Sequence, residues 1–337
     1  MIKVLIDLPE FKPALRALKK IPGIEIVRVP QPEERSRILP IDLIADCDVL
    51  FCTSLPENYE EMKQLKWVQI STAGFQQITG KGLEKNGIMA SNALGVSDIP
   101  IAEWNIAMMI NLARDLRTII RHQEAAIWDR AAIHQREIRG LVAGIWGYGG
   151  IGRATARLAK AFQMRVHVMT RSGIRSRENN YEVPGTGDPE GLLPDMQFTI
   201  SEKKAFLQDL DFLILAFPLS ASTDGIIGEE DLKMLPKRAF LLNPARGRLV
   251  KEDALIRALN EGWIAGAALD THYHYPMPAE HPLWSMPQVI LTPHISGSTL
   301  SPHYLERIYD IFGQNLERYM SGKPLLNELT VAQLANG

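Results

Sequence analysis

The chain has 337 residues, which is enough for two domains of ordinary size, each with its own hydrophobic core. Its formal net charge of −2 excludes a general attraction to nucleic acid or to an acidic membrane surface. The two cysteines, Cys47 and Cys52, are not close in sequence to a histidine, so they indicate neither a disulfide framework nor a metal site.

Neither the N-terminal segment nor the most apolar segment is typical of a membrane-targeted protein. Residues 1–10 have an early Asp and lack the basic flank and the apolar core of a signal peptide. Residues 101–116 are helix-like and apolar, but they include Glu103, Arg114 and Asp115, which a bilayer span does not tolerate. We therefore expect a cytoplasmic protein, with a helix buried between domains at 101–116.

Short apolar runs alternate with helix-like segments over the first hundred residues. This alternation is typical of a parallel α/β fold. The apolar runs are 4–6, 24–27, 49–52, 67–70 and 88–90, and the clearest helix-like segments are 11–19 and 59–65.

A glycine-rich turn follows near the middle of the chain, in the sequence GIWGYGGIGR (residues 144–153). It matches the G-x-G-x-x-G pattern, between an apolar strand candidate (141–146) and a helix-like stretch (153–162). Gly147 allows the tight turn, Gly149 lets the backbone approach a pyrophosphate, and Gly152 lets the helix pack close to the strand. The pattern predicts a dinucleotide site in a domain inserted between two parts of another domain.

A second series of strand candidates begins at this turn and predicts a doubly wound sheet of about six strands. The candidates are 141–146, 166–169, 212–216, 240–242, 265–269 and 289–291. Residues 172–199 indicate a loop insertion beside the adenosine end of the site. Residues 304–319 are typical of an amphipathic helix, which we expect to return to the first domain. We predict two doubly wound parallel-sheet α/β domains: a Rossmann domain at 100–295 within a flavodoxin-like domain formed by 1–99 and 296–337.

Seven stretches of the chain share their pattern with one enzyme family. They are LKWVQISTAG (65–74), IAE (101–103), the glycine turn, NPARGRLV (243–250), GAALD (266–270), HPLW (281–284) and TPHISG (292–297). Together they resemble the D-isomer-specific 2-hydroxyacid dehydrogenases over almost the whole chain. The resemblance implies a split substrate domain around the Rossmann domain, an active-site cleft between domains, and usually a homodimer joined through the cofactor domains.

The resemblance also assigns roles to single residues. It places the substrate-polarising Arg at Arg246, the acid/base His at His294, carboxylate-binding backbone amides at Ala73 and Gly74, and a nicotinamide-side carboxylate at Asp270. Reduction of a 2-keto acid requires a cation on the substrate, a proton donor with a pKa of about 7 and a hydride close to the carbonyl carbon. Arg and His supply the first two. The other cofactor positions are Gly147, Gly149, Gly150, Ile151, Gly152, Pro218, Ala245 and His294 itself.

One position departs from the family pattern. A Glu usually stands five residues after Asp270 and hydrogen-bonds the catalytic His, but here Tyr275 occupies that place. A carboxylate stabilises imidazolium by its charge, whereas a phenol only orients the ring, so His294 should lose its proton at lower pH than in a Glu-paired relative. Three alternatives stay open: Tyr275 supports His294, Glu280 reaches it, or no proton relay is needed.

The third alternative resembles the formate dehydrogenases of the same superfamily, which carry a neutral Gln at this place. Formate yields CO2 by losing hydride alone, so it needs no proton acceptor. The chain departs from that group at Ser97, where their approach to the long helix contains Asn. His272 and His274 form a His-x-His pair without a third ligand at recognisable spacing, so we expect no metal and side chains that face solvent or line the substrate site.

The end of the second Rossmann strand indicates which nicotinamide cofactor binds. An NAD site normally has Asp or Glu about 20 residues after the first glycine. Here Thr170, Arg171 and Ser172 occupy that place, followed by Arg175 and Arg177. Arginine pairs with a 2′-phosphate that a carboxylate would repel, so NADP is favoured and NAD is the second possibility.

The sequence therefore predicts an NADP(H)-preferring, homodimeric reductase of small 2-keto acids, of the glyoxylate or hydroxypyruvate kind. One alternative is hydride abstraction from formate. The other is a nucleotide sensor that has lost turnover together with its Glu. The intact Arg246 and His294 favour the reductase.

Overall fold

The computed structural model describes residues 1–130 and 135–336 and divides into two compact units. The first unit comprises Met1–Ser97, Glu178–Val183 and Thr299–Gly337, and the second comprises Asp98–Arg177 and Pro184–Ser298. The short segment Glu178–Val183 packs in the first unit through Tyr181, which is buried and donates a hydrogen bond of 2.8 Å to Asp310 Oδ2.

The sheet of the first unit has five parallel strands in the order β2-β1-β3-β4-β5. This order is the flavodoxin-like one. Each strand overlaps an apolar run of the sequence, because both faces of a parallel sheet are covered. The flavodoxin-like prediction is confirmed. The strands are β1 (Ile2–Asp7), β2 (Ile24–Arg28), β3 (Val49–Cys52), β4 (Trp67–Ile70) and β5 (Met89–Ser91).

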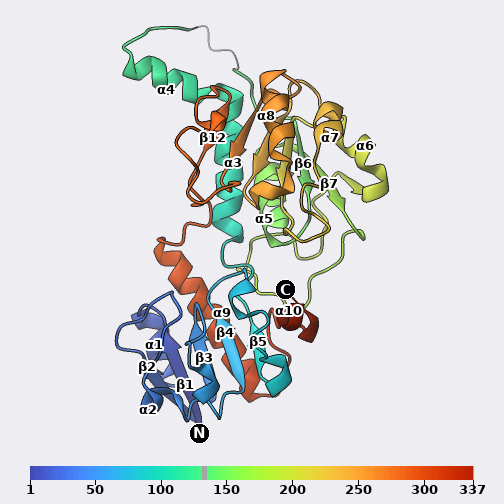
Figure 1. The fold of residues 1–337 in the computed structure, drawn as a ribbon. Coiled ribbons are helices and arrows are strands. Elements are labelled where there is room, and N and C mark those ends of the chain that lie inside the picture. The colour runs from blue at the N-terminus through green and yellow to red at the C-terminus, as the bar shows by residue number, and fades with distance from the viewer. Residues whose placement is uncertain (131–134, 337) are drawn as a thin grey trace. The chain divides into compact units, whose positions relative to one another are not determined.

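Helix α9 (Pro302–Met320) packs on this sheet, far from it in sequence (Figure 1). The Phe312 ring stacks on Phe51 at a centroid distance of 4.3 Å and on Trp67 at 5.5 Å. Asn315, fully buried on the same helix, donates to Gln69 Oε1 at 2.9 Å. Stacking rings and a satisfied buried amide therefore fix α9 in register on the strands. The other helices of this unit are α1 (Lys12–Leu18), α2 (Ile41–Ile44) and α10 (Val331–Asn336).

The sheet of the second unit has seven parallel strands in the order β12-β11-β10-β9-β6-β7-β8. Counted from β6, this is the dinucleotide-binding order 3-2-1-4-5-6 with one strand added, so the Rossmann prediction is confirmed. The strands are β6 (Val142–Trp146), β7 (Arg165–Thr170), β8 (Met196–Thr199), β9 (Phe212–Leu215), β10 (Phe240–Asn243), β11 (Gly266–Leu269) and β12 (Val289–Leu291).

Strand β8 corrects the prediction of six strands and of a loop over residues 172–199. It pairs only with β7, at the edge of the sheet, and most of its side chains are exposed. An edge strand needs no apolar run, so the sequence pattern did not reveal it. The helix expected at 101–116 is also divided: α3 (Asp98–Arg114) ends before Asp115, which has a φ of 52°, and α4 (Leu116–Glu124) follows.

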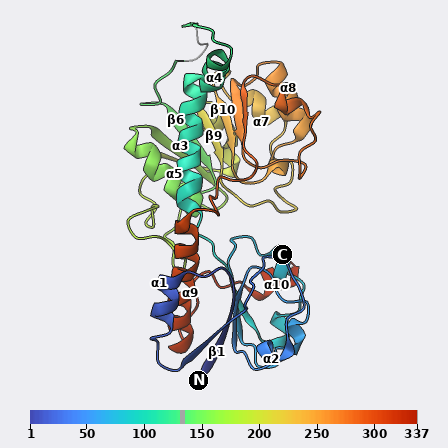
Figure 2. The same ribbon diagram turned by 90° about the vertical axis from the view of Figure 1, so that its left-hand side faces the viewer.

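Helices cover both faces of the second sheet (Figure 2). One apolar cluster joins α3 and α5 (Gly150–Ala161) to one face, and another joins α6 (Lys203–Leu207), α7 (Glu229–Met234) and α8 (Glu252–Asn260) to the other. Among the described residues, no helix is both long and apolar enough to cross a membrane. Single 3₁₀ turns lie at Tyr59–Glu61, Gln76–Ile78, Glu84–Asn86, Ile200–Glu202, Gly247–Leu249 and Pro282–Trp284. The first of these replaces the longer helix predicted over 59–65.

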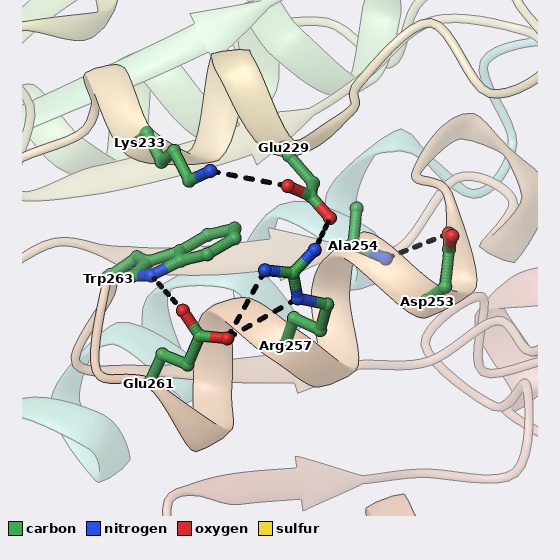
Figure 3. A network of polar contacts seen from close by, with 7 residues as sticks. All are labelled: Glu229, Lys233, Asp253, Ala254, Arg257, Glu261 and Trp263. Atoms are coloured by element: carbon green, nitrogen blue, oxygen red, sulfur yellow. Dashed lines mark hydrogen bonds and ion pairs between the residues drawn. The ribbon is translucent and has the colours of Figure 1, made fainter.

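Helices α7 and α8 are tied together at the surface by a charged network (Figure 3). Arg257 pairs with both Glu229 and Glu261, and Lys233 pairs with Glu229 at 3.3 Å. The two cations lie over the Trp263 ring, at 4.3 Å for Lys233 and 5.4 Å for Arg257. An exposed ion pair of this kind contributes little to the stability of a protein by itself. We assign the network a structural role because it connects α7 to α8.

Candidate active site

The glycine turn lies between β6 and α5, and each of its glycines meets a different steric demand. Gly147 has a φ of 94°, and a Cβ there would lie 2.5 Å from the Ala216 carbonyl oxygen. A Cβ on Gly152 would lie 2.4 Å from the carbonyl oxygen of Gly147, whereas a Cβ on Gly149 would meet nothing within 4 Å. The turn is therefore tight, the helix packs closely, and space is left beside Gly149. A dinucleotide pyrophosphate fits this arrangement, with the first-turn N–H groups of α5 as its donors.

Gly150 is required for a different reason. A Cβ there would lie 1.7 Å from Oδ2 of Asp98, the first residue of α3. The same oxygen lies 4.0 Å from Nη1 of Arg177. Arg177 is thus paired with a carboxylate at the start of α3. This differs from the sequence analysis, which grouped Arg177 with the cations available to a 2′-phosphate.

The remaining residues proposed for the adenosine end follow β7. Thr170 is partly buried at the end of the strand, and Arg171, Ser172 and Arg175 are exposed. No Asp or Glu occurs over residues 170–177. The first acid after the strand is Glu178, so the exposed Arg171 and Arg175 between them suit an anionic ligand.

Buried Arg153, which the sequence analysis did not single out, connects this segment to the glycine turn. Its guanidinium donates to the Tyr148 carbonyl at 3.1 Å and also to the carbonyls of Asp188 and Arg175. Tyr148 in turn donates its hydroxyl to Asp188 Oδ2 at 2.6 Å. Burial raises the pKa of Asp188, but the Tyr148 hydroxyl and two backbone N–H groups outweigh it, so the pKa is lowered overall. The sequence signal that could have revealed Arg153 is its position directly after Gly152, the last glycine of the turn.

Arg246 lies just after β10, in a loop that Asn243 fixes. The Asn243 Oδ1 atom accepts from the backbone N–H groups of Ala245 at 3.1 Å and Arg246 at 3.2 Å, and its Nδ2 donates to the Arg246 carbonyl at 2.8 Å. The Arg246 side chain is exposed. Its backbone is therefore held while its guanidinium can reach a ligand at the carboxyl edge of the sheet.

Asp270, at the end of β11, is completely buried and accepts four hydrogen bonds from residues 292–296. Oδ1 accepts from Thr292 Oγ1 at 2.6 Å and from the Ile295 N–H at 2.9 Å. Oδ2 accepts from the N–H of Ser296 at 3.0 Å and from its hydroxyl at 2.5 Å. A carboxylate has about four lone-pair sites, and these contacts use them. Asp270 therefore holds in place the segment that carries His294.

His294 lies in the middle of that segment with a φ of 57°, and its N–H donates to the Thr292 carbonyl at 3.0 Å. Partial burial of the ring lowers its pKa below the ordinary histidine value. The charge of Asp270 raises the pKa, and those of Arg246 and His272 lower it, with a net lowering. The charges that act on the imidazole are therefore those of Asp270, Arg246 and His272.

Tyr275 contacts His294 through its ring. The two ring centroids are 5.7 Å apart at an interplanar angle of 54°, and the Tyr275 hydroxyl accepts from the His272 N–H at 3.1 Å. Of the three alternatives, support of His294 by Tyr275 takes the form of ring packing, because the phenol hydroxyl is bonded to the His272 N–H. Glu280 is exposed, and the carboxylate whose charge acts on His294 is Asp270.

His274 lies in a cluster with Glu252 and His281, whose ligand atoms are within 4.8 Å of one another. Nε2 of His281 is 2.5 Å from Glu252 Oε1, and Nδ1 accepts from the Leu283 N–H at 3.3 Å. Since Nδ1 is an acceptor, Nε2 carries the proton that Glu252 accepts, and that nitrogen has no lone pair for an ion. These hydrogen bonds account for the pair without a metal. The sequence did not associate the three residues because they come from separate segments.

The remaining predicted residues lie in separate loops. Pro218, exposed after β9, accepts from the Thr223 hydroxyl at 2.9 Å. In the first unit, Ala73 and Gly74 follow β4, where Asn92 donates to the Ala73 carbonyl at 2.8 Å and Thr72 donates to the Gly74 carbonyl at 2.7 Å. The carbonyls of Ala73 and Gly74 are therefore hydrogen-bonded within the first unit, and these bonds fix the conformation of the turn.

Comparison with known proteins extends these observations. The family model of the D-isomer specific 2-hydroxyacid dehydrogenase NAD binding domain matches residues 106–296. A glyoxylate reductase of Thermococcus gammatolerans is 30% identical over 333 residues, covering 93% of this chain and 94% of the relative. Another, from Korarchaeum cryptofilum, is 31% identical and covers 86% and 84%.

Solved structures show the same fold at lower identity. An NADPH-dependent glyoxylate/hydroxypyruvate reductase from Sinorhizobium meliloti, in complex with NADP and sulfate, superposes with a TM-score of 0.73 at 22% identity, covering 99% of both chains. A D-isomer specific 2-hydroxyacid dehydrogenase from Lactobacillus delbrueckii in its NAD complexed form gives a TM-score of 0.77 at 22% identity, covering 98% of this chain and all of that one (100%). The two neighbours differ in cofactor, so the fold does not distinguish NADP from NAD.

Proposed function

Because the chain belongs to the D-isomer-specific 2-hydroxyacid dehydrogenase family, we propose that it reduces a small 2-keto acid of the glyoxylate or hydroxypyruvate kind with NADPH. Family membership makes it an oxidoreductase that acts with a nicotinamide cofactor on 2-hydroxy or 2-keto acids. The observation that carries the proposal is that Arg246, Asp270 and His294 follow three adjacent strands, β10, β11 and β12, at the carboxyl edge of one parallel sheet.

In this mechanism the exposed guanidinium of Arg246 binds the substrate and polarises its carbonyl. We assign the proton to the His294 imidazole, which gives it to the carbonyl oxygen as the alkoxide forms. Asp270 keeps His294 in place through the hydrogen bonds to residues 292–296. The nicotinamide, when bound, supplies the hydride to the carbonyl carbon.

Other residues complete the proposed site. The backbone amides of Ala73 and Gly74 bind the substrate carboxylate, as the family resemblance suggests. The turn from Gly147 to Gly152 would hold the cofactor pyrophosphate, and Pro218 and Ala245 would line the rest of the cofactor site, while Asp270 acts through the His294 segment. Two buried free cysteines agree with a reducing compartment, and we propose the cytoplasm.

Oxidation of formate is a second candidate because Tyr275 is neutral. Formate loses only hydride, and its oxidation needs no protonated His294. The dependence of turnover on pH, described below, separates the two activities. A nucleotide sensor without turnover is the third possibility, and an assay of turnover decides it.

We predict that the protein oxidises NADPH when mixed with at least one member of a panel of glyoxylate, hydroxypyruvate, pyruvate and longer 2-keto acids. Arg246→Ala should lower kcat/KM about a hundredfold, or on the order of 3 kcal/mol, because the cation that polarises the carbonyl is lost. NADPH affinity should change little, since the phosphates lie at the glycine turn. Absence of turnover with the whole panel, or full activity of Arg246→Ala, would contradict the assignment.

We predict tighter binding of NADPH than of NADH, by at least tenfold in Kd, since one charge-assisted hydrogen bond to the 2′-phosphate contributes about 1.5–3 kcal/mol. Quenching of tryptophan fluorescence measures both affinities. Arg171→Ala and Arg175→Ala should weaken NADPH binding and leave NADH binding unchanged. Equal affinities in the wild type would rule out the NADP preference.

We predict that kcat/KM for reduction falls on the alkaline side as pH rises through the lowered pKa of His294, because the protonated form is lost there. Tyr275→Glu should move this limb to higher pH, since a carboxylate beside the imidazole raises its pKa. Tyr275→Phe is the matched control: it keeps the ring contact and removes only the hydroxyl, which is bonded to His272. The limb should then stay in place. A pH profile unaffected by Tyr275→Glu would favour a reaction that needs no proton from His294.

We also propose a homodimer joined through α4 and residues 125–130. Ile120 and Trp128 are 51% and 93% exposed, large apolar side chains that a monomer would leave in water. Analytical ultracentrifugation should show a dimer that Ile120→Glu weakens, whereas Val331→Glu, at an exposed apolar position on α10, should not affect it. A monomeric wild type, or a dimer insensitive to Ile120→Glu, would refute this interface.

A further inference from the structure

His272 lies where three loops of the proposed site meet, and the mechanism above gives it no part. Its backbone N–H donates to the Tyr275 hydroxyl at 3.1 Å. Its carbonyl group lies against Gly247, where a Cβ would come within 2.6 Å of the His272 carbon and oxygen. Since Gly247 directly follows Arg246, the backbone of His272 sets where both the arginine loop and Tyr275 lie.

The imidazole of His272 reaches the third loop. Its Nε2 lies 2.8 Å from the Thr292 carbonyl oxygen, the same oxygen that accepts from the His294 N–H at 3.0 Å. A carbonyl only accepts, so Nε2 carries the proton. Nδ1 is buried and has no hydrogen-bond partner among the described residues, so only the Nε2 side of the ring connects to the protein through a hydrogen bond.

The contacts of Asp270 and His272 on the His294 segment do not overlap. Asp270 holds the Thr292 hydroxyl and the amides of Ile295 and Ser296. His272 holds the Thr292 carbonyl, which closes the three-residue turn around Pro293. Without His272, the carbonyl that anchors the left-handed His294 would have a bond only to His294 itself.

We propose that His272 is a positioning residue that fixes the His294 turn relative to Arg246, an inference that rests on the proposed reduction of 2-keto acids. Its imidazole acts through the Thr292 carbonyl and touches no reacting atom. A misplaced proton donor lowers the rate of the chemical step more than it weakens substrate binding. Loss of the Nε2 donor should therefore lower kcat and leave KM almost unchanged.

Two amide substitutions separate the two ring nitrogens. In His272→Gln the side-chain nitrogen lies at about the reach of Nε2, and in His272→Asn at about the reach of Nδ1. We expect His272→Asn to lower kcat on the order of tenfold to a hundredfold, with KM for the keto acid and Kd for NADPH almost unchanged. His272→Gln should recover most of the rate. His272→Phe, which keeps a ring and lacks a donor, replaces His272→Asn if that variant does not fold.

Wild-type kcat in His272→Asn, or equal losses in His272→Asn and His272→Gln, would overturn the inference. If the wild type reduces no 2-keto acid, the proposed function fails, and hydrogen exchange of the peptide spanning residues 292–298 then decides the inference alone. Faster exchange in His272→Asn than in both the wild type and His272→Gln supports it. Equal exchange in all three proteins overturns it.

Discussion

The site depends on the buried carboxylate of Asp270. A charge taken out of water costs several kcal/mol unless it is fully hydrogen-bonded, and each hydrogen bond to a charged group returns about 1.5–3 kcal/mol. The four donors of residues 292–296 meet that demand, and in doing so they fix the path of the backbone on both sides of His294. The left-handed φ of His294 persists because its neighbours are bound in this way. One electrostatic requirement at the end of β11 therefore determines where His294, the proposed proton donor, lies.

The parallel sheet explains why the other groups gather near this carboxylate. All seven strands of the second unit run in one direction, so the loops that follow them emerge at the same edge. The glycine turn follows β6, Thr170 ends β7, and Arg246 comes directly after β10. The proposed dinucleotide site, cation and proton donor therefore all lie at the edge that this topology creates.

Much of this arrangement could be predicted from the sequence, because buried parallel strands are apolar runs and the glycine turn has a recognisable pattern. Strand β8 could not, since an edge strand has no such run. The sequence pattern also could not predict contacts between segments that are distant in the chain. Arg177 pairs with Asp98, and the His272 side chain donates to the Thr292 carbonyl. The contact of Tyr275 with His294 could be predicted only in part. The family pattern places Tyr275 beside His294, but it does not show in which direction the hydroxyl points.

The most direct test of the account is a crystal structure of the protein with NADPH and oxamate, an unreactive analogue of a 2-keto acid. We expect oxamate to bind with its oxygens within hydrogen-bond distance of the Arg246 guanidinium and the His294 imidazole, while Asp270 keeps its bonds to residues 292–296. Oxamate bound away from Arg246 and His294, or a His294 turn released from Asp270, would contradict it.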